Sequence, residues 1–245
     1  MSNHQLNPEH KLIPFQTSAL PPGPWLVFAP HADDETYGMG GSLLKACEAG
    51  IETHLVVMTD GALGGDTSNL VDVREREVHQ AAEILGISSV DSWQQPDRGL
   101  TVSEELVNRI CQKIRDVEAA SVFFPGPFEL HPDHRIASLL VWAALQQLGQ
   151  SSAPNAYSYE VAVQNPINLL IDITTQIPRK EQAMAVYASQ NDENNYEELV
   201  LSLDKGRTFT LPAEVSHAEG FYLYSQEELA ISLKEVTHKI IDLYL

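Results

Sequence analysis

The chain has 245 residues, 43% of them hydrophobic, and carries 34 acidic against 15 basic side chains, for a formal net charge of -19. A chain of this length and composition can bury its core as one large domain. Its negative charge repels phosphate backbones and anionic lipid, so we expect no nucleic-acid or membrane partner. The two cysteines, Cys47 and Cys111, are too few for a disulfide framework. We interpret them as buried thiols of a cytoplasmic protein.

The first half of the chain alternates short apolar runs with helix-like stretches. Residues 1–24 form a polar, proline-dotted leader without the pattern of a signal peptide. Strands are then predicted at residues 25–29, 51–59, 87–93 and just before Pro125, and helices at residues 40–49, 73–85, about 103–117 and 133–148. Asp72 is a predicted helix N-cap, and Gly50 and Gly86 are predicted to follow helix C-termini. Sustained alternation of this kind predicts an α/β fold, Rossmann-like and doubly wound, with a mainly parallel sheet and helices on both faces.

The pattern becomes less regular after Gly149. Strands are predicted at residues 156–163 and 169–174, and helices at residues 179–189 and 226–243. Residues 190–198 are rich in Asn and Glu, which indicates a solvated loop or a helix start. We therefore expect one domain over residues 25–245, in which residues 25–149 form the Rossmann-like core and residues 150–245 complete the sheet and build one wall of a pocket.

Two clusters of histidine and acidic residues each follow a predicted strand. The first runs from Pro30 to Glu35 and the second from His131 to His134. If the first four strands take the doubly wound order 3-2-1-4, strands one and four are neighbours at the point where the strand order reverses. Ligands of such sheets bind outside the carboxyl ends of the strands at that point. The two clusters are thus predicted to form one site.

The residue types in this predicted site suit metal-assisted hydrolysis. Two histidines and one carboxylate, supplied by His31, Asp34 and His134, are a common set for a catalytic zinc that keeps a fourth position open for water. Asp33 and His131 remain beside the metal, where hydrolysis uses a general base and an electrophilic stabiliser. One zinc per chain is expected. The alternative is that each cluster merely starts a helix, with acidic side chains or a proline in the first turn.

Together the two clusters resemble the motifs of the LmbE-like, or PIG-L, zinc deacetylases, usually written His-Pro-Asp-Asp-Glu and His-x-x-His. Further elements of the resemblance run through most of the chain: Thr59-Asp60-Gly61, Arg74-x-x-Glu77, Lys180 through Tyr187-x-Ser189-Gln190, and Ala218-Glu219-Gly220-Phe221. Any one element is weak. The two histidine motifs in order, with these elements between and after them, are highly specific.

The resemblance implies an activity and a role for each site residue. Known members remove acetyl groups from N-acetylglucosamine units. The implied function here is a zinc-dependent hydrolase that removes the N-acetyl or N-acyl group of an amino sugar or its conjugate. The family's zinc ligands carry over to His31, Asp34 and His134. Its general base carries over to Asp33, its oxyanion-stabilising or leaving-group histidine to His131, and its substrate-contacting arginine to Arg74.

The chain departs from the family pattern at two positions. Ala32 replaces the usual proline, which loosens the loop without removing a functional group. Glu129 replaces a tyrosine found in some relatives. At the pocket rim, this extra carboxylate favours a polar or cationic part of the substrate, or is simply solvated. The substrate of those relatives is therefore not transferred to this chain.

Three further residues each keep more than one interpretation. Arg74 lies three positions before Glu77, so the two could form an ordinary pair on a helix surface instead of contacting substrate. Glu35 is expected to orient a ligand or to accept backbone amides. Asp133 is expected to be the partner of His131 or of Asp33, or only to favour the helix N-terminus.

Two other classes of protein stay open on the sequence alone. A metal phosphoesterase also uses histidine and aspartate, although two-metal sites need more ligands than these motifs supply. A non-catalytic sugar-binding protein could keep the pocket without the chemistry, although it has no need of a base beside the metal. The expected partner is a small N-acylated amino sugar or glycoconjugate, and a homo-oligomer is compatible with the sequence.

Overall fold

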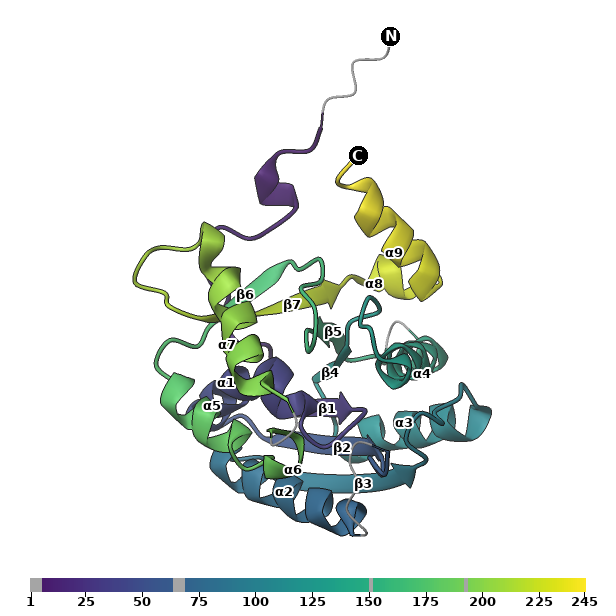
Figure 1. Ribbon diagram of the computed structural model, residues 1–245. Coiled ribbons are helices and arrows are strands. Elements are labelled where there is room, and N and C mark those ends of the chain that lie inside the picture. The colour runs from purple at the N-terminus through teal and green to yellow at the C-terminus, as the bar shows by residue number, and fades with distance from the viewer. Residues whose placement is uncertain (1–5, 64–68, 150–151, 192–193) are drawn as a thin grey trace.

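The computed structural model describes residues 6–63, 69–149, 152–191 and 194–245. Its centre is a seven-stranded sheet in the order β3-β2-β1-β4-β5-β7-β6 (Figure 1). The strands are β1 (Trp25–Ala29), β2 (Thr53–Thr59), β3 (Ser89–Gln95), β4 (Ser121–Pro125), β5 (Asn155–Tyr159), β6 (Leu169–Asp172) and β7 (Ala218–Tyr224). The strands from β3 to β5 are parallel, whereas β7 pairs antiparallel with both β5 and β6. The predicted α/β fold and the 3-2-1-4 strand order are confirmed.

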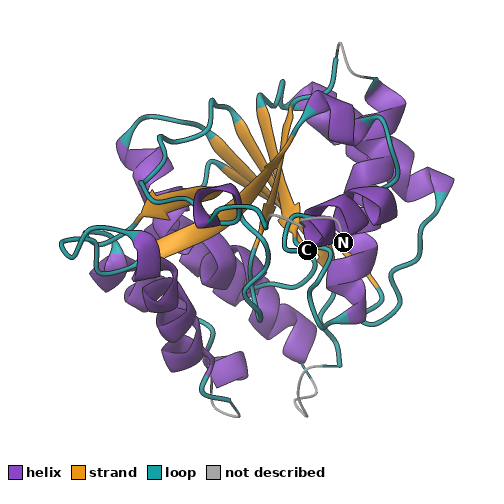
Figure 2. Cartoon of the chain, turned by 90° about the horizontal axis from the view of Figure 1, so that it is seen from above, coloured by secondary structure: helices purple, strands orange, loops and turns teal. Residues whose placement is uncertain are grey.

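Helices lie on both sides of this sheet (Figure 2). They are α1 (Asp34–Glu48), α2 (Leu70–Leu85), α3 (Glu104–Asp116), α4 (Pro132–Leu148), α5 (Ile177–Met184), α6 (Ala188–Asn191), α7 (Tyr196–Gly206), α8 (Gln226–Leu229) and α9 (Leu233–Asp242). Short 3-10 turns occupy Glu9–Lys11 and Arg207–Thr210. Over the described ranges, we find no helix with the length and apolar character needed to cross a membrane.

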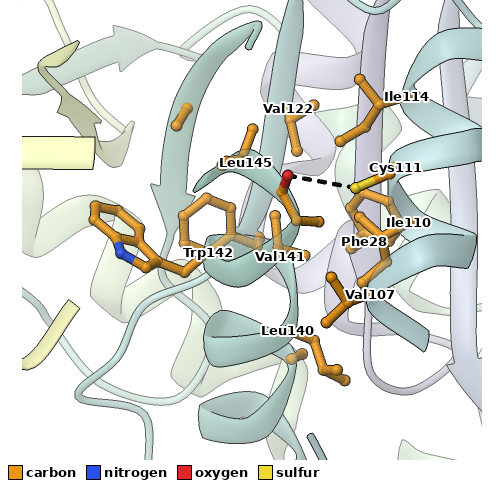
Figure 3. Packing of buried hydrophobic residues seen from close by; sticks show 14 of the residues in the cluster. Phe28, Val107, Ile110, Cys111, Ile114, Val122, Leu140, Val141, Trp142 and Leu145 are labelled. Carbon is orange, nitrogen blue, oxygen red and sulfur yellow. Dashed lines mark hydrogen bonds between the residues drawn. The ribbon is translucent and has the colours of Figure 1, made fainter. Parts of the chain in front are cut away.

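Strand β1 is buried at all five positions because helices cover both faces of the sheet. Leu26 and Phe28 belong to one core cluster with residues of α3 and α4, whereas Trp25 and Val27 belong to another with residues of α1 and α2. Figure 3 shows the first cluster. In it, the Cys111 thiol donates to the Ala144 carbonyl at 3.4 Å.

Cys111 is buried as expected, but the same expectation is wrong for Cys47, which is exposed on the last turn of α1. Leu43, Leu44 and Ala46 fill the buried positions of that part of the helix. The following residues of the helix, Cys47 and Glu48, face solvent.

Helix α1 begins six residues before the predicted start at residue 40, but it is not continuous. Met39 has non-helical dihedral angles (φ -150°, ψ 22°), so two helical segments meet there at a kink. The predicted helix corresponds to the second segment. Close packing explains the glycines around the kink. A Cβ at Gly38 would lie 2.4 Å from the Glu160 carbonyl oxygen, and one at Gly41 would lie 2.6 Å from Ile173.

Other predicted boundaries also shift. Helix α2 begins at Leu70, so Asp72 lies inside its first turn and is not the N-cap. The helices predicted at residues 179–189 and 226–243 are each split in two, as α5 and α6 and as α8 and α9. Helices α8 and α9 each begin with their own capping box, at Ser225 and at Ser232. Helix α7 begins at Tyr196, within the stretch interpreted as a loop or a helix start, but its length was not predicted. Strand β7 was not predicted, since its burial depends on the rest of the fold.

The part of the leader that the structure describes contacts the C-terminal half of the chain. The Ser18 amide donates to the Leu170 carbonyl at 2.7 Å, and the Thr210 hydroxyl donates to the Pro14 carbonyl at 2.6 Å. Residues 1–5 lie outside the described residues.

Candidate metal centre and pocket

The loops that follow β1 and β4 meet where the strand order of the sheet reverses, which we call the switch point. There they bring the two predicted motifs together. The Asp34 Oδ2 atom lies 3.3 Å from His31 Nδ1 and 3.2 Å from His134 Nε2. The ring centroids of His31 and His131 are 4.6 Å apart. Side chains from residues about a hundred positions apart in the chain therefore share one site.

Three sets of donor atoms in this site could hold a metal. The predicted ligands His31, Asp34 and His134 converge on the Asp34 carboxylate. The ring nitrogens of His31, His131 and His134 lie within 4.8 Å of one another, and so do donor atoms of His31, Asp97, His131 and Asp133. His131, which we predicted to act on the substrate, is thus close enough to be a third histidine ligand.

Two carboxylates flank the far side of the His31 ring. Its Nε2 atom lies 3.3 Å from Asp133 Oδ2 and 3.4 Å from Asp97 Oδ1. Carboxylates at this position fix the ring orientation and tautomer of a metal-bound histidine, leaving Nδ1 for the metal. Asp97 was not singled out from the sequence. The signal that could have found it is its place just after β3, at the same edge of the parallel sheet as the two motifs.

Asp133 contacts His131 as expected, but its carboxylate lies closer to His31. Its carboxylate lies beside His31 and accepts the Arg98 amide at 2.7 Å. Its contact with His131 is mainly through the backbone, since the Asp133 amide donates to His131 Nδ1 at 3.2 Å while the nearest carboxylate oxygen is 3.9 Å away. Asp133 therefore links the two histidine motifs.

Glu129 does not lie at the pocket rim, so that expectation is wrong. Its side chain is 1% exposed and accepts the amides of Val161 and Ala162 at 2.9 and 3.1 Å. Its Oε2 atom lies 3.7 Å from His134 Nδ1. The turn after β4 directs this carboxylate inward, behind His134, where backbone amides satisfy it. It orients a candidate ligand rather than meeting substrate.

The backbone of Asp33 is strained. Its φ of 141° lies in a region that non-glycine residues avoid, and such strain persists where surrounding contacts impose it. Those contacts include the buried Glu35, which accepts the Asp33 amide at 3.3 Å and the Tyr187 hydroxyl at 2.6 Å. This arrangement agrees with the second interpretation of Glu35, as an acceptor of backbone amides. Burial, reinforced by the neighbouring Asp34 charge, raises the pKa of Asp33 well above its usual range.

The buried carboxylates around His31 and His134 favour a positive charge in the site. Burial lowers the pKa of His134, but Asp34 and Glu129 outweigh it and raise that pKa to about 9. Burial likewise opposes the charge of His31, whose pKa is nevertheless raised well above its ordinary value by Asp133, Asp34 and Asp97. Burial and the two neighbouring histidines lower the pKa of His131. A metal dication replacing the protons of His31 and His134 would satisfy the same carboxylates, so the residues present fit a metal.

A pocket of about 450 Å³ opens over these groups and is lined by His31, Asp33, Asp34, Tyr37, Leu63, Arg74, Asp97, Arg98, Leu130, His131, Pro132, His134, Val161, Ala162, Gln190, Tyr196 and Val200. One wall comes from the loops that follow β1, β3 and β4 and from the first turns of α1 and α4. The other comes from the C-terminal half of the chain, through residues such as Gln190, Tyr196 and Val200. The space suits a small ligand of the size of a sugar unit.

Arg74 is buried at the edge of this pocket and is not part of a surface pair. It is 4% exposed, and a Cβ at Gly61 would lie 2.1 Å from its Nη1 atom, so the glycine makes room for it. Glu77 is also buried and accepts both the amide and the hydroxyl of Ser189, at 3.0 and 2.6 Å. The surface interpretation of Arg74 and Glu77 is therefore wrong.

The protein has a Rossmann-like, doubly wound α/β fold. At the switch point of its sheet, histidines and carboxylates form a site that could hold a metal. Residues 26–145 match the family described as PIG-L: GlcNAc-PI de-N-acetylase. The match covers just under half of the chain and identifies a PIG-L domain in it.

Proteins similar to this chain are named as deacetylases. The chain is 28% identical over 218 residues to a probable N-acetyl-alpha-D-glucosaminyl L-malate deacetylase 2 of Bacillus anthracis, covering 81% of this chain and 94% of that one. It is 29% identical over 191 residues to diacetylchitobiose deacetylase of Thermococcus kodakarensis, covering 70% and 72%. The solved N,N'-diacetylchitobiose deacetylase of Pyrococcus horikoshii shares the fold, with a TM-score of 0.76 at 24% identity over 85% of this chain and 86% of that one.

Proposed function

We propose that this protein is a zinc-dependent N-deacetylase that hydrolyses the N-acetyl or N-acyl amide of an amino sugar or its conjugate. One observation carries the proposal. Asp33 and His131 line the same pocket as the converging donors of His31, Asp34 and His134. A base and an imidazole beside a metal site suit amide hydrolysis, and a pure binder has no use for them. The relatives named as deacetylases of N-acetylglucosamine compounds agree with this activity.

In this proposal His31, Asp34 and His134 hold one zinc. A set of two histidines and one carboxylate suits zinc and leaves a coordination position open. When bound, the metal would polarise the amide carbonyl and lower the pKa of a water molecule. Asp97 and Asp133 hold His31 for this task, and Glu129 holds His134.

The remaining groups act on the water and the substrate. Asp33 takes the proton of the attacking water, and its burial keeps its pKa high enough for a base that must later release that proton. His131 stabilises the developing oxyanion or hands a proton to the departing amine. Arg74 contacts the substrate from the pocket wall. The acidic composition and the two free cysteines favour a cytoplasmic enzyme acting on a small, unanchored substrate.

The direct test is release of free primary amine from a panel of N-acetylated sugars, measured with zinc, after chelation and after zinc is restored. We expect about one zinc per chain by elemental analysis, and amine release that stops on chelation and returns with zinc. Phosphate release from phosphate esters with two tightly held metals would instead indicate a phosphoesterase. Sugar binding without amine release would indicate a non-catalytic protein.

Arg74→Ala should mainly raise KM, by about tenfold or more, because it removes a charged contact made in both the ground state and the transition state. The measurement is steady-state kinetics on the best substrate of the panel, together with thermal unfolding. Arg179→Ala is the matched control, since it removes a half-exposed arginine that lies outside the pocket lining. An unchanged KM with a lower Tm in Arg74→Ala would leave Arg74 a purely structural role.

A further inference from the structure

The kink in α1 is held by a carboxylate from the other end of the chain. The second helical segment of α1 begins after Met39, and its first amides have no partner within that segment. The amides of Gly41 and Ser42 donate to the two carboxylate oxygens of Glu219, at 2.8 and 2.7 Å. Glu219 lies on β7 and is 1% exposed. It therefore caps a helix start inside the core, where a negative charge is favourable.

Glu219 is one member of a buried ion network. Lys180 Nζ lies 2.8 Å from Glu219 Oε1 and 2.6 Å from Asp204 Oδ2, and the Lys180 side chain is fully buried. A Cβ at Gly40 would lie 3.4 Å from Lys180 Cγ, so the lysine stem packs directly against the kink. Three elements of the C-terminal half, α5, α7 and β7, thus converge on α1 through these three charges.

Stability alone is a poor reason for such a network. Removing three charges from water carries a large desolvation penalty, and well-packed apolar residues often do as well or better. A buried network does define one geometry sharply, because each partner must meet the others at fixed distances. The geometry defined here is that of the helix that starts at the candidate metal centre.

The same short stretch of chain holds both ends of the first segment of α1. Lys180, on α5, binds the Glu219 carboxylate at the kink. Tyr187, three residues past the end of α5, donates to Glu35 at the start of the segment. Between these two anchors lies the first segment, preceded by the strained Asp33 and beginning at Asp34. A strained backbone persists only when its surroundings impose it, and these anchors do so.

We propose that Lys180 and Glu219 are positioning residues that fix the kink of α1 and thereby hold Asp33 and Asp34 in register with the two histidine motifs. The effect on turnover rests on the proposed deacetylase function. The effect on metal affinity rests only on the proposed role of Asp34 as a ligand, and not on the deacetylase chemistry.

Glu219→Gln tests this role, since the amide keeps the shape but loses the charge and one of the two acceptor oxygens. We expect kcat to fall on the order of 10- to 100-fold with little change in KM, as for a small misplacement of reacting groups. We also expect a similar loss of zinc affinity, measured without substrate by competition with a chelating dye. The zinc measurement stands even if no substrate is turned over, so failure of the deacetylase proposal and failure of this one are distinguishable.

Ile240→Ala is the control for stability, because Ile240 belongs to the core cluster on the opposite face of the sheet. It should lower Tm without changing zinc affinity or kcat. If Glu219→Gln does not fold, the triple variant Lys180→Met, Asp204→Asn and Glu219→Gln removes all three charges of the network together and carries the same expectation. A folded variant of either kind with the zinc affinity and kcat of the natural protein would overturn the proposal.

Discussion

Asp33→Asn should lower kcat on the order of 100- to 10,000-fold while leaving one zinc per chain in place. The amide keeps the size of the side chain but cannot take a proton from water. Asp72→Asn is the matched control, because Asp72 is an exposed acid on α2 that lies outside the pocket lining. The measurements are kcat at saturating zinc and metal content by elemental analysis. Full turnover in Asp33→Asn would remove this residue from the mechanism.

The pH profile sharpens the Asp33 test. A general base works in its ionised form, so the rate falls as pH decreases through the pKa of the base. Burial and the Asp34 charge raise the pKa of Asp33, which moves this acidic limb upward from the range of an ordinary aspartate. The residual rate of Asp33→Asn should lack that limb. A limb that persists unchanged would assign it to another group.

The pair Asp34→Ala and His131→Ala decides which donors hold the metal. We expect Asp34→Ala to lose zinc, and activity with it, because one of three protein ligands is gone. We expect His131→Ala to keep zinc while kcat falls about 100-fold or more, because only the stabilisation of the developing charge is lost. Both variants are measured for zinc content after dialysis and for kcat at saturating zinc.

Two results would change this assignment. If His131→Ala loses zinc while Asp34→Ala keeps it, the metal is held by the three histidines whose nitrogens lie within 4.8 Å of one another. If Asp33→Asn loses zinc while Asp34→Ala keeps it, the roles of the two adjacent carboxylates are reversed. Asp33 and Asp34 are adjacent in one strained turn, so these variants are the test that assigns their separate roles.

The C-terminal half contributes to the site in two ways that are separable by experiment. Gln190, Tyr196 and Val200 line the pocket, where they meet whatever ligand enters. Lys180 and Glu219 lie away from the pocket lining and act on α1 from behind. Changes in the first group should alter KM and substrate preference. Changes in the second should alter zinc affinity and kcat.

The sequence by itself determined the architecture and the core of the site. The sequence alternates apolar runs with helix-like stretches, separated by residues such as Gly50 and Gly86, and this pattern predicts the strands and helices. Alternating strands and helices can pack in only a few ways, of which the doubly wound sheet is one. That sheet places the ends of β1 and β4 together, so His31 and His134 could be predicted to meet. Both features rest on short-range patterns and one topological rule.

Only the tertiary structure decided which carboxylate serves which group. Asp97 and Asp133 bind His31, Glu129 lies behind His134, and Glu219 caps α1 from 177 residues away. An acidic residue in a sequence gives no sign of whether it will be solvated or buried, because that depends on which distant amides and cations the fold brings to it. For the same reason β7 and the extent of α7 were not predicted, since both depend on contacts with residues far away in the sequence.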